Sequence, residues 1–218
     1  RHLHGSDFDL CGARLTALAT GALWWAEPAA LVVSDLHLGR SERIARQAGG
    51  LLPPYEVTDT LMRLDRDIAL TDPRLVICLG DTFDDPLAAR LAPDHGDWLA
   101  RLMAGRRWVW IAGNHDPGPL HVGGEHRAEL TLGPLTFRHI AEPDATGEIS
   151  GHYHPKIRLA GQSCRCFLAD ARRLILPAYG TFTGGLDWSD PAFRDLFTHP
   201  VRAILTGKTA RAVPLPAP

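Results

Sequence analysis

Residues 108–116 read WVWIAGNHD, an apolar run that ends in three consecutive hydrogen-bonding side chains. The run is rich in tryptophan, valine and isoleucine, which is typical of a buried strand. Asn114, the only asparagine of the chain, follows the run between a glycine and a histidine. We therefore expect a strand that delivers Asn114, His115 and Asp116 to a functional site.

Two earlier runs have the same form, LVVSDLHL at 31–38 and RLVICLGD at 74–81. Between the runs, residues 56–68 and 97–105 carry apolar side chains at helical spacing, which predicts helices that alternate with the strands. Alternation of this kind indicates a mostly parallel sheet, whose ligand site lies beyond the carboxyl ends of the strands. The polar ends of all three runs lie at that edge.

The chain changes in character after residue 126, where short β-rich segments and turn signals replace the helical pattern. These segments predict antiparallel hairpins that form a second sheet. Two sheets packed together, with helices outside the first, make a layered α/β sandwich. Because no linker or break in composition divides the 218 residues, we expect one domain over residues 1–218.

The composition is that of a globular protein, with 22% charged and 45% apolar residues and a net charge of −2. This charge excludes a global basic surface of the kind that non-specific nucleic-acid binders carry, so any contact with a polyanion must be local. No apolar run is long enough to span a membrane. The four cysteines show neither zinc-finger spacing nor the density of a disulfide scaffold, and we expect a cytoplasmic protein with reduced thiols.

Side chains of metal-ligating type follow the predicted strands in both halves of the chain. Carboxylates, imidazoles and one amide oxygen suit manganese, iron, zinc or similar divalent ions and exclude thiolate chemistry. Seven ligands are too many for one ion, whereas two ions about 4 Å apart that share a carboxylate would use them all and would suit in-line phosphoryl displacement. These seven candidate ligands are Asp35, His37, Asp81, Asn114, His139, His152 and His154.

The ordered D-x-H, GD-x-x-D, GNHD, H and GH-x-H segments, between residues 35 and 154, resemble those of the calcineurin-like metallophosphoesterase superfamily. The fuller pattern of SDLHLG, RQAGGLLPPYE, GDTFDD, GNHD, GEISGHYHPK and LPAYGTFTGGLDWSDPAF is similar to one subgroup, the ligase-associated DNA damage response endonucleases of the PdeM type. The resemblance implies a four-layer αββα sandwich, with two mixed sheets flanked by helices.

The resemblance also implies a role for each residue. One ion would be bound by Asp35, His37, Asp81 and His154, and the other by Asp81, Asn114, His139 and His152. His115 would face the scissile phosphate as a proton donor, with Asp84 orienting it. A hydroxide between two divalent ions would attack phosphorus in line. We expect Mn²⁺, with Fe, Zn, Ni or Co as alternatives.

Only a few residues of the sequence bear on the substrate. Arg40, Arg43 and Arg46 recur at three-residue spacing on a predicted short helix and could bind a phosphate backbone, although a solvated arginine face fits equally well. Tyr153 could stack on a base, and packing is its alternative role. The PdeM resemblance implies a phosphodiesterase or endonuclease that acts on DNA in repair beside a ligase and a helicase, with no membrane partner.

Two alternatives stay open at this point. A small-molecule phosphoesterase or nucleotide pyrophosphatase is one, because SDLHL also occurs in the pyrophosphatases of lipid A assembly; those enzymes usually carry an apolar amphipathic insertion, which this sequence lacks. A non-catalytic scaffold with the same fold is the other, although scaffolds lose ligands and none is lost here. The sequence leaves the oligomeric state open.

Overall fold

A seven-stranded mixed sheet forms the first β-layer of the structure, a computed structural model that describes residues 4–48, 53, 55–84, 91–115 and 122–216. Its strands run in chain order from β1 to β7. The first four pair antiparallel, and β4 to β7 pair parallel. The strands are β1 (Gly5–Leu10), β2 (Ala13–Leu18), β3 (Leu23–Trp25), β4 (Ala30–Val33), β5 (Leu75–Cys78), β6 (Arg107–Ile111) and β7 (Glu125–Arg127).

The second sheet has the strand order β15-β14-β12-β13-β10-β9-β8, and β11 pairs with β12 beside it. Most of its pairs are antiparallel, as the hairpin signals predict. The strands are β8 (Glu129–Leu132), β9 (Leu135–Arg138), β10 (Glu148–Ser150), β11 (Lys156–Leu159), β12 (Gln162–Ala169), β13 (Arg173–Ile175), β14 (Arg202–Leu205) and β15 (Arg211–Pro214).

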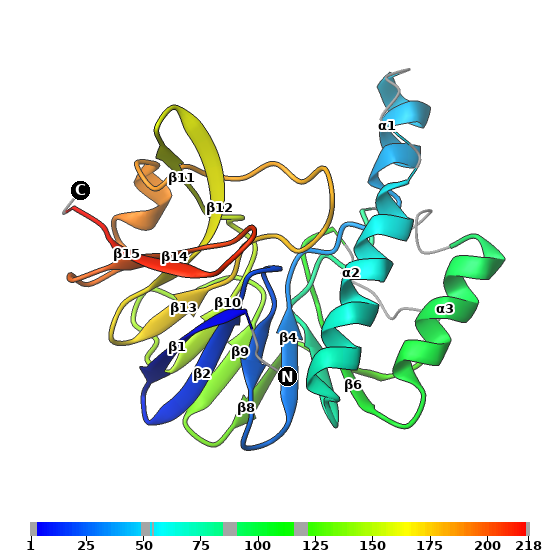
Figure 1. Cartoon of the computed structure of the whole chain (residues 1–218), viewed down its shortest axis with the longest axis horizontal. Helices are drawn as coiled ribbons and strands as arrows, with labels where there is room; N and C mark the ends of the chain where they lie inside the picture. Colours follow the sequence, from blue (N-terminus) through cyan, green and yellow to red (C-terminus); the bar gives the residue numbers. More distant parts are fainter. Residues whose placement is uncertain (1–3, 49–52, 54, 85–90, 116–121, 217–218) are drawn as a thin grey trace.

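The described residues form three α-helices, of which α2 and α3 pack on the face of the first sheet away from the second sheet, and α1 projects beyond the end of α2 (Figure 1). They are α1 (Arg40–Ala48), α2 (Glu56–Thr71) and α3 (Pro93–Met103). Val57, Leu61, Leu64 and Ile68 of α2 are buried in one cluster with side chains of β4 and β5, which confirms the predicted helical spacing. The helix ends at Asp72, whose left-handed conformation (φ 44°, ψ 61°) turns the chain toward β5.

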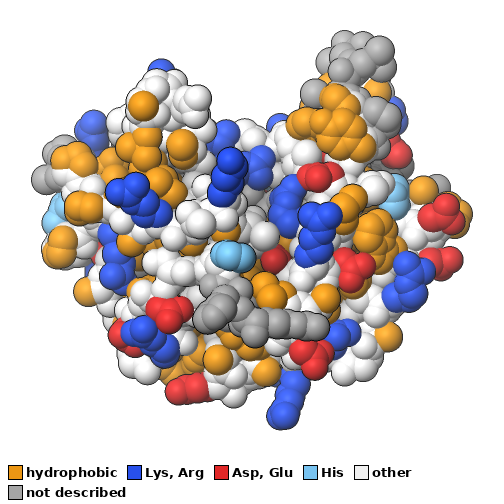
Figure 2. Space-filling model, in the orientation of Figure 1, with side chains coloured by type: hydrophobic (Ala, Val, Ile, Leu, Met, Phe, Trp, Pro, Cys, Tyr) orange, Lys and Arg blue, Asp and Glu red, His pale blue; other side chains and the backbone are white. Residues whose placement is uncertain are grey.

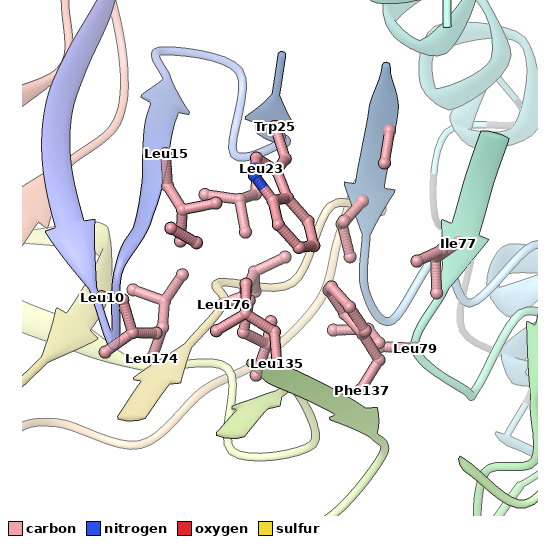
Figure 3. Packing of buried hydrophobic residues seen from close by; sticks show 14 of the residues in the cluster. Leu10, Leu15, Leu23, Trp25, Ile77, Leu79, Leu135, Phe137, Leu174 and Leu176 are labelled. Atoms are coloured by element: carbon pink, nitrogen blue, oxygen red, sulfur yellow. The ribbon is translucent and has the colours of Figure 1, made fainter. Parts of the chain in front are cut away.

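The main core lies between the two sheets. Figure 3 shows Leu15, Leu23 and Trp25 of the first sheet facing Leu135, Phe137 and Leu174, which lie in or next to strands of the second. Trp25 and Phe137 meet with ring centroids 6.4 Å apart. Because this apolar layer is continuous, the loops at the ends of both sheets are held in fixed positions relative to each other.

The fourth layer of the sandwich lies on the outer face of the second sheet. In this layer, Phe193, Leu196 and Phe197 pack against the outer face of the sheet around Cys166 and Leu168. In the part of the chain that the structure describes, this layer contains one 3₁₀ helix, η1 (Pro191–Phe193), and irregular chain rather than an α-helix. The layer order of the expected αββα sandwich is confirmed, with a short 3₁₀ turn in place of the last α-helix.

Two features of the strands differ from the sequence predictions. The meander β1–β3 precedes the first predicted strand, so the first sheet is only parallel in its second half. In the second sheet, β10 pairs parallel to both of its neighbours, β9 and β13. The hairpin signals describe strands that follow each other directly, whereas β10 joins its neighbours through longer connections. No helix in the described residues is long and apolar enough to cross a membrane.

Candidate metal centre

The parallel strands β4, β5 and β6 end side by side, and the polar residues that follow them meet at this edge. Backbone hydrogen bonds join the loops after β4 and β5: the Asp35 N–H donates to Gly80 O at 3.3 Å and the His37 N–H donates to Asp81 O at 2.9 Å. The second sheet contributes His139 directly after β9 and His152 just after β10. Loops from both sheets therefore build one site.

Asp35, His37 and His154 form the first group of side chains that could hold an ion. His154 Nε2 lies 3.1 Å from Asp35 Oδ1 and 3.4 Å from His37 Nε2. His37 Nε2 lies 3.9 Å from the same Asp35 oxygen. The three donor atoms thus surround one point, and Asp35 and His37 are buried.

Asp81, His139 and His152 form the second group, and Asn114 joins it through its side-chain oxygen. Asn114 Oδ1 lies 2.8 Å from His139 Nε2 and 3.0 Å from His152 Nδ1. The two imidazole nitrogens lie 3.2 Å apart. The side-chain oxygen of the only asparagine of the chain therefore lies next to two histidines.

Asp81 lies between the two groups. Its Oδ2 atom is 3.4 Å from His139 Nε2 in the second group and 3.9 Å from His37 Nε2 in the first. Its other oxygen, Oδ1, accepts the backbone N–H of His115 at 2.8 Å. One carboxylate is therefore within reach of both groups, which is the arrangement that two ions with a shared ligand require.

The protonation of the histidines fits bound cations. The Nδ1 atom of His139 donates to Leu79 O at 2.6 Å, and the Nδ1 atom of His37 lies 2.9 Å from Asp84 Oδ1. Both bonds place the proton on Nδ1 and leave the Nε2 lone pair directed into the site, as in histidine ligands of metals. Asp35 Oδ1 is buried without a hydrogen-bond partner, which is costly unless a cation meets it. This donor set of oxygen and imidazole nitrogen fits divalent ions.

The backbone is strained at these positions. Positive φ angles, which are uncommon for residues other than glycine, occur at five of the seven candidate ligands. Such strain persists only where the surrounding structure imposes it, and it gathers at functional sites. The five are Asp35 (51°), His37 (45°), Asp81 (47°), His152 (70°) and His154 (46°).

Two glycines leave room for the ligands. A Cβ atom on Gly80 would lie 2.5 Å from Nδ1 of His139, and one on Gly151 would lie 2.5 Å from Asp35 Oδ2 and 1.7 Å from Ser34 Oγ. Gly80 also has a φ of 85°. Glycine is therefore required at both positions, because a side chain would collide with the ligands. At Gly80 the positive φ angle also favours glycine.

The carboxylates of the site are ionised. Burial opposes the charge on Asp81, but His139, the His115 N–H and His37 outweigh burial and lower the pKa of Asp81 to about 2. The pKa of Asp35 is also lowered, because contacts with His154 and His139 outweigh its burial. In the second group, Asp81 and Asp35 outweigh burial and raise the pKa of His139, whereas burial and the neighbouring His139 lower that of His152. The anionic carboxylates give the site the charge that cations need.

His115 is exposed at the mouth of the site. Its ring centroid lies 5.5 Å from that of His37, and its backbone N–H donates to Asp81. The sequence interpretation placed Asp84 behind His115, but the buried Asp84 carboxylate accepts from His37 Nδ1, Arg40 and Arg43 instead. Burial opposes the charge on Asp84, and these donors overcome it and lower its pKa to about 2. Asp84 thus positions a residue of the first group rather than His115.

The arginines of α1 all lie beside carboxylates. Arg40 lies 3.3 Å from Asp84 Oδ1, Arg43 binds the other Asp84 oxygen, and Arg46 lies 3.8 Å from Glu42. Arg40 and Arg43 each give a donor to the buried Asp84 carboxylate, and the binding of a phosphate backbone by the three arginines stays a prediction. Tyr153 packs against His152 (5.0 Å between ring centroids) and Phe193 (5.7 Å), so the structure favours its packing role.

Three residues of the site were missed from the sequence. The Ser34 hydroxyl donates to Asp35 Oδ2 at 2.5 Å, and Glu56 Oε1 accepts the Gly39 N–H at 2.7 Å, which fixes the start of α1. Gly180 approaches so closely that a Cβ would lie 2.1 Å from Leu36 O. All three lie in the quoted SDLHLG, RQAGGLLPPYE and LPAYGTFTGGLDWSDPAF segments, and only Ser34 is next to a candidate ligand, so membership of these segments was their shared signal. Asp116 lies outside the described residues.

An open pocket of about 340 Å³ adjoins the second group. Asn114 and His139 line it, together with Ile140, which is 44% exposed, and Arg138. Arg138 is held by carboxylates, including Glu129 at 2.9 Å, so its charge is compensated. The pocket offers space beside the metal centre for part of a substrate.

This sandwich, with two sets of acidic and histidine ligands at the carboxyl ends of parallel strands, defines a metal-dependent hydrolase of phosphoric ester bonds. The calcineurin-like phosphoesterase model matches residues 29–147, and the chain belongs to that family, whose members depend on two metal ions. The structure resembles a nuclease MPE from Pseudomonas putida, with a TM-score of 0.75 and 32% identity over 97% of this chain and 100% of that one.

A phosphoesterase from E. coli, YfcE, is more distant, with a TM-score of 0.37 and 13% identity over 80% of this chain and 87% of the other. The comparison with curated proteins gave no match.

Proposed function

We propose that this chain is a phosphodiesterase that cleaves DNA. The observation that carries the proposal is the likeness to the Pseudomonas putida nuclease, with 32% identity over 97% of this chain and 100% of that one. The shared Asp81 between two groups of ligands supports it, since this arrangement suits in-line displacement at phosphorus. A role in DNA repair beside a ligase and a helicase is part of the same proposal.

The seven candidate residues would hold two divalent ions. Asp35, His37 and His154 would bind one, Asn114, His139 and His152 the other, and Asp81 would bridge them. The ions, when bound, would activate water and neutralise the charge that develops on the phosphate oxygens. We propose Mn²⁺ for both, because the donor set combines carboxylate, amide oxygen and imidazole.

His115 would protonate the leaving oxygen. Its side chain is exposed at the mouth of the site, while its backbone N–H orders Asp81, so the imidazole is free to meet the substrate. A histidine suits this role because its ordinary pKa allows it to carry and to release a proton near neutral pH. Asp84 would act indirectly, because its hydrogen bond with His37 would fix the orientation of that metal ligand.

The test is a substrate panel with added Mn²⁺. Bis-p-nitrophenyl phosphate and its monoester distinguish a diesterase from a monoesterase, while single-stranded, double-stranded and nicked DNA test the nuclease proposal against nucleotide diphosphates. We expect turnover of the diester and of DNA, and none by Asp81→Asn. Preference for the monoester or for nucleotide diphosphates alone would contradict a nuclease. Absence of both turnover and bound metal would favour a scaffold.

A further inference from the structure

Two cations lie directly opposite each other on neighbouring strands. Lys156 of β11 pairs with Arg165 of β12 in the antiparallel register. Like charges at such positions destabilise a sheet. In the described part of the chain, neither side chain forms an ion pair with a carboxylate. No ion pair within the described residues therefore offsets the repulsion between Lys156 and Arg165.

The pair faces away from the apolar cluster of the fourth layer. Ile157 and Cys166, the next residues along the two strands, are both buried in that cluster. Because successive side chains of a strand point to opposite faces, Lys156 and Arg165 point to the other face. Segment 178–185 lies on that face, and it contacts both cations.

Arg165 is held one short segment away from the metal centre. Its Nη1 atom donates to Ala178 O at 3.1 Å and to Gly180 O at 2.9 Å. The N–H of the same Gly180 donates to Asp35 O at 3.1 Å. These bonds use one nitrogen of the guanidinium, which leaves its other donors available.

Lys156 lies near His154, a member of the first ligand group. It follows His154 by two residues, and a Cβ atom on Gly185 would lie 2.1 Å from His154 O and 2.9 Å from Lys156 Cε. The aliphatic part of Lys156 therefore passes over Gly185 beside the His154 carbonyl, in space that a side chain would fill.

These two cations differ from Arg40 and Arg43 of α1, which form ion pairs with Asp84. Figure 2 shows that Lys and Arg side chains gather around the hollow between the part of the molecule with β11 and β12 and the part with α1. On a chain with a net charge of −2, two adjacent cations that form no ion pair within the described residues indicate an anionic ligand.

We propose that Lys156 and Arg165 bind the phosphate next to the scissile one, so that the site selects a chain with at least two consecutive phosphodiesters over a substrate with one. The inference rests on the proposed nuclease function and names its substrate class. A phosphate would satisfy both cations and remove their repulsion, and a flexible lysine beside an anchored guanidinium suits a backbone oxygen. Contacts of this kind position the strand and carry no sequence preference.

The experiment compares two substrates in Lys156→Ala. We expect kcat/KM for a single-stranded thymidine oligonucleotide to fall about tenfold, as for a lost charge-assisted bond. The slope of log kcat/KM against log salt should decrease by about one. Bis-p-nitrophenyl phosphate, which has one phosphate, should be hydrolysed at the wild-type rate. Lys156→Arg should restore the oligonucleotide activity, and the thermal stability of Lys156→Ala should equal or exceed that of the wild type.

Arg14→Ala is the matched control. Arg14 is an exposed cation on β2, and the strand register places it beside the amino-terminal end of β4, opposite to the metal centre. Arg14→Ala should leave kcat/KM unchanged for both the oligonucleotide and the small diester. A second readout needs no substitution: Lys156 and Lys208 are the only lysines, so mass spectrometry resolves their acetylation. The oligonucleotide, added without metal, should protect Lys156.

The outcomes separate this inference from the proposed function. Equal losses on both substrates, no loss on the oligonucleotide, or unprotected Lys156 would overturn the inference even if the wild type cleaves DNA. If the wild type cleaves no DNA but the oligonucleotide still protects Lys156, the nuclease proposal fails and the phosphate site stands. Hydrolysis of the small diester without any cleavage or binding of the oligonucleotide would reject both.

Discussion

His37 Nδ1 lies 2.9 Å from Asp84 Oδ1, while Nε2 on the other side of the ring faces Asp35 and His154. A carboxylate in this position fixes the tautomer and makes the imidazole a stronger ligand. Arg43 binds the second oxygen of Asp84, so α1 is connected to the first ligand group through two side chains. The buried Asp84 therefore orients the ligand His37, whereas the sequence interpretation made it the partner of His115.

Asp84→Asn distinguishes the two roles. We expect the affinity of the first group for Mn²⁺ to fall about 10- to 100-fold, as for other partners of histidine ligands, with turnover recovered at saturating Mn²⁺. Titration calorimetry and activity at increasing Mn²⁺ measure both quantities. Asp94→Asn, which removes an exposed carboxylate on α3, is the control. Turnover that stays low at saturating metal would instead place Asp84 behind the proton donor.

Asp81→Asn should lower the metal content, whereas His115→Gln should leave it unchanged. Asp81 Oδ2 is within 4 Å of histidines in both groups, so its loss should abolish stable binding of two ions and all turnover. His115→Gln keeps the backbone N–H that orders Asp81, and we expect two ions per chain with turnover reduced about 10²-fold or more. Elemental analysis and kinetics of the two variants check this. Wild-type turnover in His115→Gln would remove its role as an acid.

Gly151→Ala should damage the first ligand group although it replaces none of the ligands. The new methyl group would lie 1.7 Å from Ser34 Oγ and 2.5 Å from Asp35 Oδ2, so the Asp35 carboxylate must shift. We expect a loss of about 1–3 kcal/mol in stability from overpacking, and weaker metal binding. Gly96→Ala is the control, because a Cβ on Gly96 in α3 has no atom within 4 Å. Denaturant unfolding and metal titration measure both effects, and unchanged metal affinity would contradict the predicted shift of Asp35.

The sequence predicted the residues of the site better than the contacts between them. Asp35, Asp81 and Asn114 were recognisable because each follows an apolar run, and adjacent parallel strands must bring such positions together. His139 has no glycine beside it, and it was inferred because a second ion needs a further ligand. The structure places it 3.4 Å from Asp81.

Contacts between distant segments were not predictable in the same way. The partner of Asp84 depends on how α1 packs against the loop after β5, and sequence spacing does not contain that information. The same holds for Lys156 and Arg165, whose register is set by the β11–β12 pairing. The first strands were missed because neither β1 nor β2 is a continuous apolar run that ends in a candidate ligand, and β1 is buried only at Phe8 and Leu10.

Glu56 should make stability depend on pH. Burial raises its pKa from 4.5 to about 7, although the N–H groups at the start of α1 oppose the change. The folded state therefore binds this proton more tightly than the unfolded chain, so the stabilisation is complete below about pH 4.5 and is lost as the pH rises through about 7. In the metal-free protein, the melting temperature of the wild type should approach that of Glu56→Gln near pH 5.

At about pH 8 the same comparison should favour Glu56→Gln, because a neutral amide keeps an acceptor for the Gly39 N–H without a buried charge. Thermal unfolding followed by circular dichroism across this range measures the difference, and groups common to both proteins cancel in it. Glu27→Gln, at an exposed position in the loop between β3 and β4, should follow the wild type at every pH. A difference between wild type and Glu56→Gln that does not change with pH would show that Glu56 is ionised in both states. The hydrogen bonds at the start of α1 would then outweigh its burial.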